Sequence, residues 1–73
     1  MSDAREYIHE VTDPTGKTHS VALPCQADYA VLAYRSNGWW LSSWHVSKTE
    51  AYEWAHLLAA NAGYSTYVAA VNR

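Results

Sequence analysis

The stretch Tyr29-Ala-Val-Leu-Ala-Tyr-Arg-Ser-Asn-Gly-Trp-Trp-Leu-Ser-Ser-Trp-His-Val46 decides the fold of this chain. Asn37-Gly38 separates two strand-like runs, and this dipeptide is typical of a tight hairpin turn because the favoured turn needs φ > 0 at both central residues. The sequence therefore predicts a β-hairpin of residues 29–36 and 39–46. In this register Arg35 lies opposite Trp40, where the two side chains can form a cation–π pair.

Trp39 and Trp40 are consecutive in the second predicted strand, so their side chains must point to opposite faces of the sheet. Each of the two faces also carries other apolar side chains of the predicted hairpin. One predicted face carries Tyr29, Val31, Ala33, Arg35, Trp40 and Trp44, and the other carries Ala30, Leu32, Tyr34, Trp39 and Leu41.

A second hairpin is predicted on the N-terminal side, around Asp13-Pro14-Thr15-Gly16-Lys17. Asp, Pro and Gly in this order suit a type I turn followed by a bulge. The strands are expected at residues 5–12 and 18–23. If Asp13 opposes Lys17, His9 and His19 lie diagonally on the face that looks inward.

On the C-terminal side, Ser47-Lys-Thr-Glu50 forms a capping box and predicts a helix over residues 48–62. Ala51, Ala55, Leu58 and Ala62 fall on one narrow stripe of that helix, which lets it approach a sheet closely. Gly63 suits the left-handed position after a helix, and residues 64–71 are typical of a closing strand.

These elements predict one α+β domain spanning residues 1–73, with the order β-β-β-β-α-β. We expect two layers, a mainly antiparallel five-stranded sheet and one helix across it. The chain has no Phe, but four Trp and six Tyr supply bulk for a small core. Five basic and seven acidic residues give a net charge of −2, which disfavours duplex DNA as a partner.

Catalysis, cofactors and resident metals are not predicted. The lone cysteine, Cys25, excludes an internal disulfide and has no recognisable activating partner. His9 and His19 are two ligands at most, fewer than a structural metal site needs, so a metal or small-ligand site on the first hairpin is kept only as an alternative. Without an apolar leader or membrane span in the sequence, we expect a soluble, cytoplasmic protein with no membrane partner.

One helix covers only one face of the predicted sheet, which leaves a large aromatic surface on the other. We therefore predict a non-catalytic protein–protein interaction module, a homodimer or a binder of a foreign protein. The alternatives are an aromatic platform for single-stranded nucleic acid and two hairpins that fold over one another and bury both faces. The predicted contact residues are Tyr34, Arg35, Trp39, Trp40, Leu41 and Trp44.

The run Val46-Ser-Lys-Thr-Glu-Ala-Tyr-Glu-Trp-Ala-His-Leu-Leu-Ala-Ala-Asn-Ala-Gly-Tyr-Ser-Thr-Tyr-Val68, after Gly38-Trp39-Trp40, resembles a unit found in small uncharacterised accessory proteins of actinobacterial phages. That unit is a strand, a capped "TEA" helix and a second strand, and the resemblance covers about residues 38–71. It implies an accessory protein that binds and modulates a host protein. The resemblance assigns no functional residue.

Overall fold

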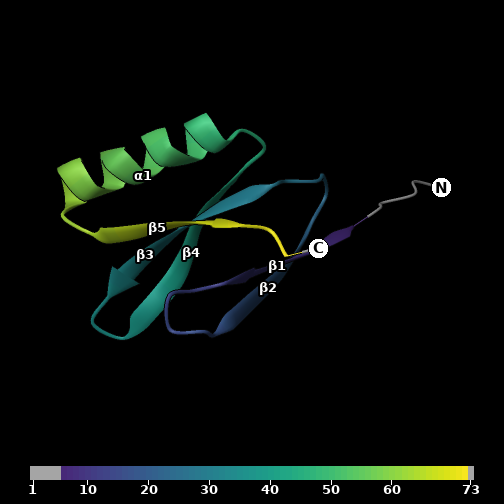
Figure 1. The fold of residues 1–73 in the computed structure, drawn as a ribbon, viewed down its shortest axis with the longest axis horizontal. Helices are drawn as coiled ribbons and strands as arrows, with labels where there is room; N and C mark the ends of the chain where they lie inside the picture. Colours follow the sequence, from purple (N-terminus) through teal and green to yellow (C-terminus); the bar gives the residue numbers. More distant parts are fainter. Residues whose placement is uncertain (1–5, 73) are drawn as a thin grey trace.

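The computed structural model describes residues 6–72, and Figure 1 shows their course. The elements in chain order are β1 (Tyr7–Thr12), β2 (Thr18–Leu23), β3 (Tyr29–Arg35), β4 (Gly38–His45), α1 (Lys48–Ala62) and β5 (Ser65–Ala70). The predicted α+β class and element order are confirmed. The single five-stranded sheet is wrong, because β1 and β2 form a sheet of their own and the other three strands form a second sheet in the order β4-β3-β5. All strand pairs are antiparallel.

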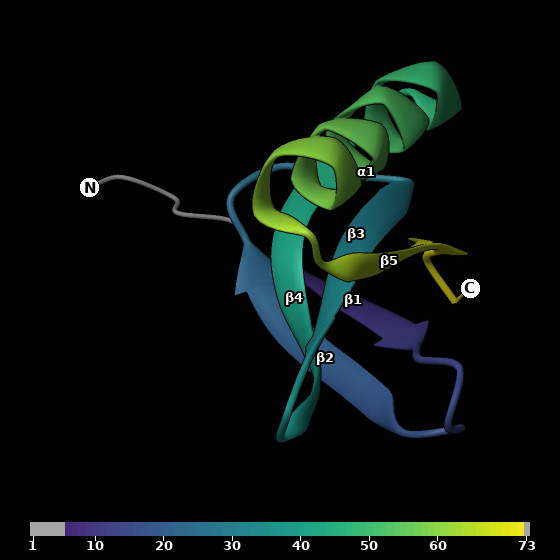
Figure 2. The ribbon, with the colours of Figure 1, turned by 90° about the vertical axis from the view of Figure 1, so that its left-hand side faces the viewer.

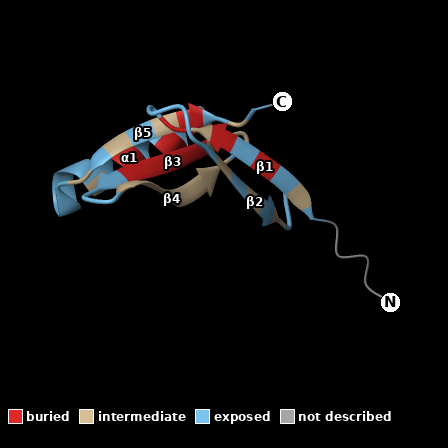
Figure 3. Ribbon diagram, turned by 90° about the horizontal axis from the view of Figure 1, so that it is seen from below, coloured by how far each residue is buried: buried red, intermediate tan, exposed pale blue. Residues whose placement is uncertain are grey.

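The three-stranded sheet lies between α1 and the β1–β2 hairpin, so the molecule has three layers (Figure 2) rather than the two predicted. Consecutive residues of β3 face opposite sides and therefore serve two cores. Leu32 packs on the hairpin side with Val11. Val31 packs on the helix side with Ala51 and Ala55. Figure 3 shows that buried residues follow β3 closely, as expected for a central strand covered on both faces.

The turn of the first hairpin forms as the sequence predicts. The Gly16 amide donates to the Asp13 carbonyl (2.9 Å), and the Asp13 amide donates to the Lys17 carbonyl (2.9 Å). Gly16 has φ of 91°, which only glycine adopts at little cost. The predicted register is confirmed, because Val11 pairs with His19 and His9 with Val21.

The Asp13 side chain is buried and holds this turn together. One carboxylate oxygen accepts from the Thr15 amide (2.8 Å), the Thr15 hydroxyl (2.5 Å) and the Lys17 amide (3.1 Å). The other lies 2.8 Å from Nε2 of His19. Burial alone would raise the pKa of Asp13, but the hydrogen bonds from Thr15, His19 and the Lys17 amide outweigh it and hold the pKa well below its ordinary value. The carboxylate is therefore ionised in the folded hairpin.

His9 links β1 to the β2–β3 connection by a hydrogen bond and to β4 by its ring contact with Trp44. The Ala27 backbone N–H can only donate, so Nε2 of His9 is its acceptor (2.9 Å). The ring proton therefore sits on Nδ1 and is donated to the Tyr7 carbonyl (2.8 Å). A second link comes from the chain end, where the Asn72 amide donates to the Glu10 carbonyl (2.8 Å).

The second hairpin forms with a different turn from the one predicted. Arg35 pairs with Gly38, so Ser36 and Asn37 are the two residues of the turn. In the described chain Gly38 has φ of 120° and no residue other than glycine has positive φ, which rules out the predicted turn with Asn37 at φ > 0. The register shifts by two residues and places Trp39 opposite Tyr34. A shift of two preserves the faces, so Trp39 and Trp40 still point to opposite sides.

A β-bulge farther along β4 reverses the predicted face of Trp44. Leu32 pairs with Leu41, but Val31 pairs with Ser43, which leaves Ser42 as an extra residue. One extra residue moves every later side chain to the other face. Trp44 therefore lies on the hairpin side with Leu41 and not on the helix side with Trp40.

The helix has the predicted bounds, the serine part of the predicted capping box and the predicted C-terminal glycine. The Ser47 hydroxyl accepts from the Glu50 amide (3.4 Å), and Gly63, in the left-handed region, donates to the Ala59 carbonyl (3.2 Å). Ala51 and Ala55 are buried on the sheet. Ala62 is exposed and does not continue the predicted buried stripe. Nowhere in residues 6–72 is a helix both long and apolar enough to span a membrane.

We expect Asp13→Asn to lower the free energy of unfolding at neutral pH. In this variant the free energy of unfolding should also fall less steeply as the pH is lowered. Because the folded-state pKa lies below the ordinary value of 3.8, the ionised carboxylate stabilises the fold above that pH, and this contribution declines as the pH falls below it. Urea unfolding followed by circular dichroism at neutral pH and at about pH 3 measures both effects. Glu10→Gln, which removes an exposed carboxylate from β1, is the control. An unchanged acid slope in Asp13→Asn would contradict this role.

We expect His9→Ala to destabilise the fold by about 2–4 kcal/mol, because it opens a cavity beside Trp44 and removes the acceptor for the Ala27 amide. His9 is 3% exposed and its ring lies 5.3 Å from that of Trp44. The neighbouring Ile8 is 67% exposed, so Ile8→Ala should cost under about 0.5 kcal/mol. Equal unfolding midpoints for the two variants in urea would refute the linking role of His9.

Candidate functional site

The six predicted contact residues divide between the two faces of the sheet. Tyr34, Trp39, Leu41 and Trp44 are on the hairpin side, and Arg35 and Trp40 are on the helix side. Tyr34 and Arg35 are exposed, and the other four side chains are half-buried.

Three aromatic rings form a row across the end of the three-stranded sheet on the hairpin side. The rings of Tyr34 and Trp39 lie 5.4 Å apart and those of Trp39 and Tyr67 lie 6.1 Å apart, both in edge-to-face geometry. Tyr34 is 46% exposed and Tyr67 is 41% exposed, whereas Trp39 is half-buried between them. The rings are therefore held by contacts with one another, while the two tyrosines remain open to solvent.

Leu41 and Trp44 do not belong to this open surface. Both pack on the core that β1 closes, against residues such as Val11 and Leu32. Trp44 also makes the edge-to-face contact with His9. Both side chains are half-buried, and their contact with a partner stays a prediction.

On the helix side, Arg35 and Trp40 both contact Tyr64. The Trp40 and Tyr64 rings meet edge to face at 5.9 Å. The Arg35 guanidinium carbon lies 5.5 Å from the centre of the Tyr64 ring, so the predicted cation–π contact forms with Tyr64 and not with Trp40. The Trp40 indole Nε1 is buried and has no hydrogen-bond acceptor within the described residues. A buried donor of this kind costs about 1–3 kcal/mol.

The two clusters meet at one end of the molecule, which we call the aromatic end. It consists of Tyr34, Arg35, Trp39, Trp40, Tyr64 and Tyr67. In Figure 1 this end lies at the left, the side on which both the β3–β4 turn and the α1–β5 connection are found. Ser65 pairs with Tyr34, which brings the two segments together.

Sequence reasoning missed Tyr64 and Tyr67 because it could not place the last strand. β5 pairs with β3 on the side opposite β4, and its pairing with Leu32 sets Tyr67 on the hairpin side. The available signal was the Tyr-Ser-Thr-Tyr spacing, which predicts two tyrosines on opposite faces of a strand. Nothing in the spacing indicates the neighbouring strand.

The histidines considered as metal or ligand groups hold the fold together. Both ring nitrogens of His9 lie in hydrogen bonds to the backbone, and Nε2 of His19 lies against Asp13. Within residues 6–72, no group of three or more His, Cys, Asp or Glu side chains is arranged to hold a metal ion. Cys25 is exposed in the β2–β3 connection.

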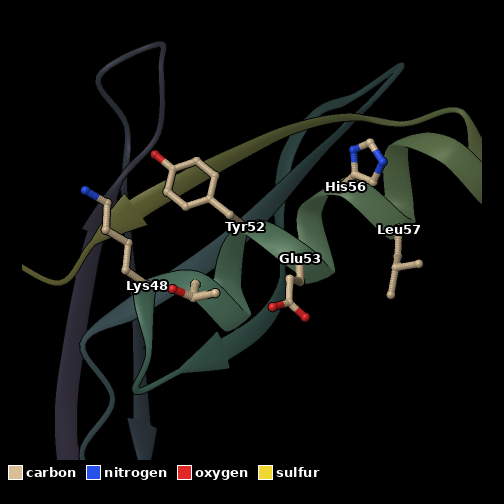
Figure 4. Close-up of a pocket in the computed structure, with 6 residues that line it drawn as sticks. Lys48, Tyr52, Glu53, His56 and Leu57 are labelled. Atoms are coloured by element: carbon tan, nitrogen blue, oxygen red, sulfur yellow. The ribbon is translucent and has the colours of Figure 1, made fainter.

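A shallow depression of about 610 Å³ lies on the outer side of α1 (Figure 4). All of its lining residues come from this one helix: Lys48, Thr49, Tyr52, Glu53, His56 and Leu57. A ligand there would rest on one wall, so the depression lacks the enclosure of a small-molecule site. Tyr52 is 54% exposed and provides a matched aromatic residue far from the row on the sheet.

Comparison with known proteins found no family model, curated protein or solved structure that matches this chain.

Proposed function

We propose that this chain is a non-catalytic protein-interaction module that binds its partner through the aromatic end. The open row of Tyr34, Trp39 and Tyr67 carries the proposal. Tyr and Trp combine an apolar body with a polar tip, so they tolerate water in the free protein and burial in a complex. Edge-to-face contacts restrict the rings before binding, which lowers the conformational-entropy cost of binding.

Residue composition at this end supports a protein partner. Residues 34–40 and 63–67 are all Tyr, Trp, Arg, Ser, Thr, Asn or Gly. Antibody binding loops favour much the same set, in which rigid aromatic rings supply area and small polar residues supply hydrogen bonds. The similarity lies in the physics of contact and implies no shared ancestry.

The occupant of this end is a foreign protein or a second copy of the chain. A homodimer would bury the row against the same row of a second copy, and the molecule would then self-associate at micromolar concentrations. A phage accessory protein acting on a host component would use the same surface for a foreign partner. A platform for single-stranded nucleic acid is the alternative, and it would require salt-dependent quenching of tryptophan fluorescence by oligonucleotides.

We expect the double variant Tyr34→Ser/Tyr67→Ser to keep its fold and to lose at least about 90% of partner binding, since exposed aromatic anchors carry much of an interface's energy. Binding is measured as retention on immobilised protein of peptides selected against the wild type, and self-association by light scattering. Tyr52→Ser, which removes a somewhat more exposed tyrosine from α1, is the matched control. If both variants bind like the wild type, the aromatic end is not the binding surface.

A further inference from the structure

A second feature of the aromatic end gives information on the chemistry of its partner. A depression of about 440 Å³ lies at the β3–β4 turn. Its lining residues are Arg35, Ser36, Asn37, Gly38, Trp39 and Trp40. Because the two indoles belong to opposite faces, a group seated there touches both the exposed aromatic row and the cluster around Tyr64.

Arg35 supplies the charged hydrogen-bond donors among the residues that line this depression. Arg35 is exposed, and in the described part of the chain no carboxylate lies within ion-pair distance of it. Its stacking on Tyr64 uses the face of the guanidinium and leaves the N–H groups at its edge available. An acceptor oxygen on a partner can therefore pair with the exposed Arg35 guanidinium.

The charge at this end is opposite to that of the whole molecule. The chain has a net charge of −2, but residues 34–40 and 63–67 contain one cation, Arg35, and no acidic residue. An anionic group is therefore attracted to this end, although the rest of the surface repels anions.

Two other occupants fit this charge distribution poorly. A second copy in a two-fold dimer through this end would bring Arg35 near its own equivalent and would supply no carboxylate from residues 34–40 or 63–67. A nucleic acid strand needs several cations along its path, whereas this site has one and the chain is acidic overall.

We propose that the aromatic end recognises an Asp or Glu carboxylate flanked by apolar side chains on a foreign protein, with the carboxylate paired to Arg35 and the apolar groups resting on Trp39 and Tyr34. This inference rests on the proposed function and names the chemistry of its partner. Planar pairing suits arginine, because its N–H groups match both oxygens of a carboxylate.

Selection of peptides from a random 12-residue library on the immobilised full chain tests the proposal. We expect the retained peptides to be enriched in Asp or Glu next to Leu, Ile, Phe or Trp. A synthetic peptide of the enriched type should bind about tenfold more weakly when its acidic residue is replaced by the matching amide, and its affinity should fall as salt is raised.

Arg35→Gln should cause a similar loss of about tenfold for the acidic peptide and little change for the amide peptide. Lys48→Gln removes the same charge from the start of α1 and is the matched control, with an expected change of under about twofold. Arg35→Lys keeps the charge but not the planar geometry, so an intermediate loss is expected.

The outcomes separate this inference from the proposed function. Enriched peptides without acidic residues, or acidic peptides that bind Arg35→Gln as tightly as the wild type, overturn the carboxylate proposal and leave the interaction module intact. Retention no greater than on Tyr34→Ser/Tyr67→Ser overturns both. A chain that retains no peptides but binds oligo(dT) with strong salt dependence also overturns both, in favour of single-stranded nucleic acid.

Discussion

Strand β3 is the constraint on which the rest of the structure depends, because consecutive side chains of one strand supply two separate cores. Leu32 faces the β1–β2 hairpin and Val31 faces α1, and both are fully buried. A strand covered on both faces needs an uninterrupted apolar run, which Ala30 to Ala33 provides. The same alternation directs Trp39 and Trp40 to opposite sides and so produces an aromatic cluster on each face.

The β1–β2 hairpin covers only part of the apolar surface on the second face of the three-stranded sheet. The hairpin closes over Leu41 and Trp44, where His9 and Asn72 attach it by hydrogen bonds. Those bonds lie away from the β3–β4 turn, and Tyr34 and Tyr67 remain exposed.

The parts of the fold that could be predicted are those set by local chemistry. The turn of the first hairpin is determined by four consecutive residues, Asp13-Pro14-Thr15-Gly16. The register predicted for β1 and β2 was therefore correct. Asn37-Gly38 is compatible with more than one turn, and the bulge at Ser42 has no local sequence signal, so Trp44 was assigned to the wrong face. Separation of the strands into two sheets depends on contacts between distant segments, which local sequence patterns do not reveal.

The grouping of the aromatic residues could be predicted only in part, for the same physical reason. Trp39 and Tyr34 were identified because they are neighbours within one hairpin, but Tyr64 and Tyr67 join them only through the pairing of β5 with β3. That pairing also changes the role of Arg35. Opposite Trp40 it would have been an internal cation–π partner, whereas on Tyr64 it is held at the rim of the depression with its donors free. The ring contacts that fix Arg35 and Trp39 form on folding, so the conformational entropy of ordering them is lost before any partner arrives. The aromatic end is for this reason a preorganised surface rather than an unprotected part of the core.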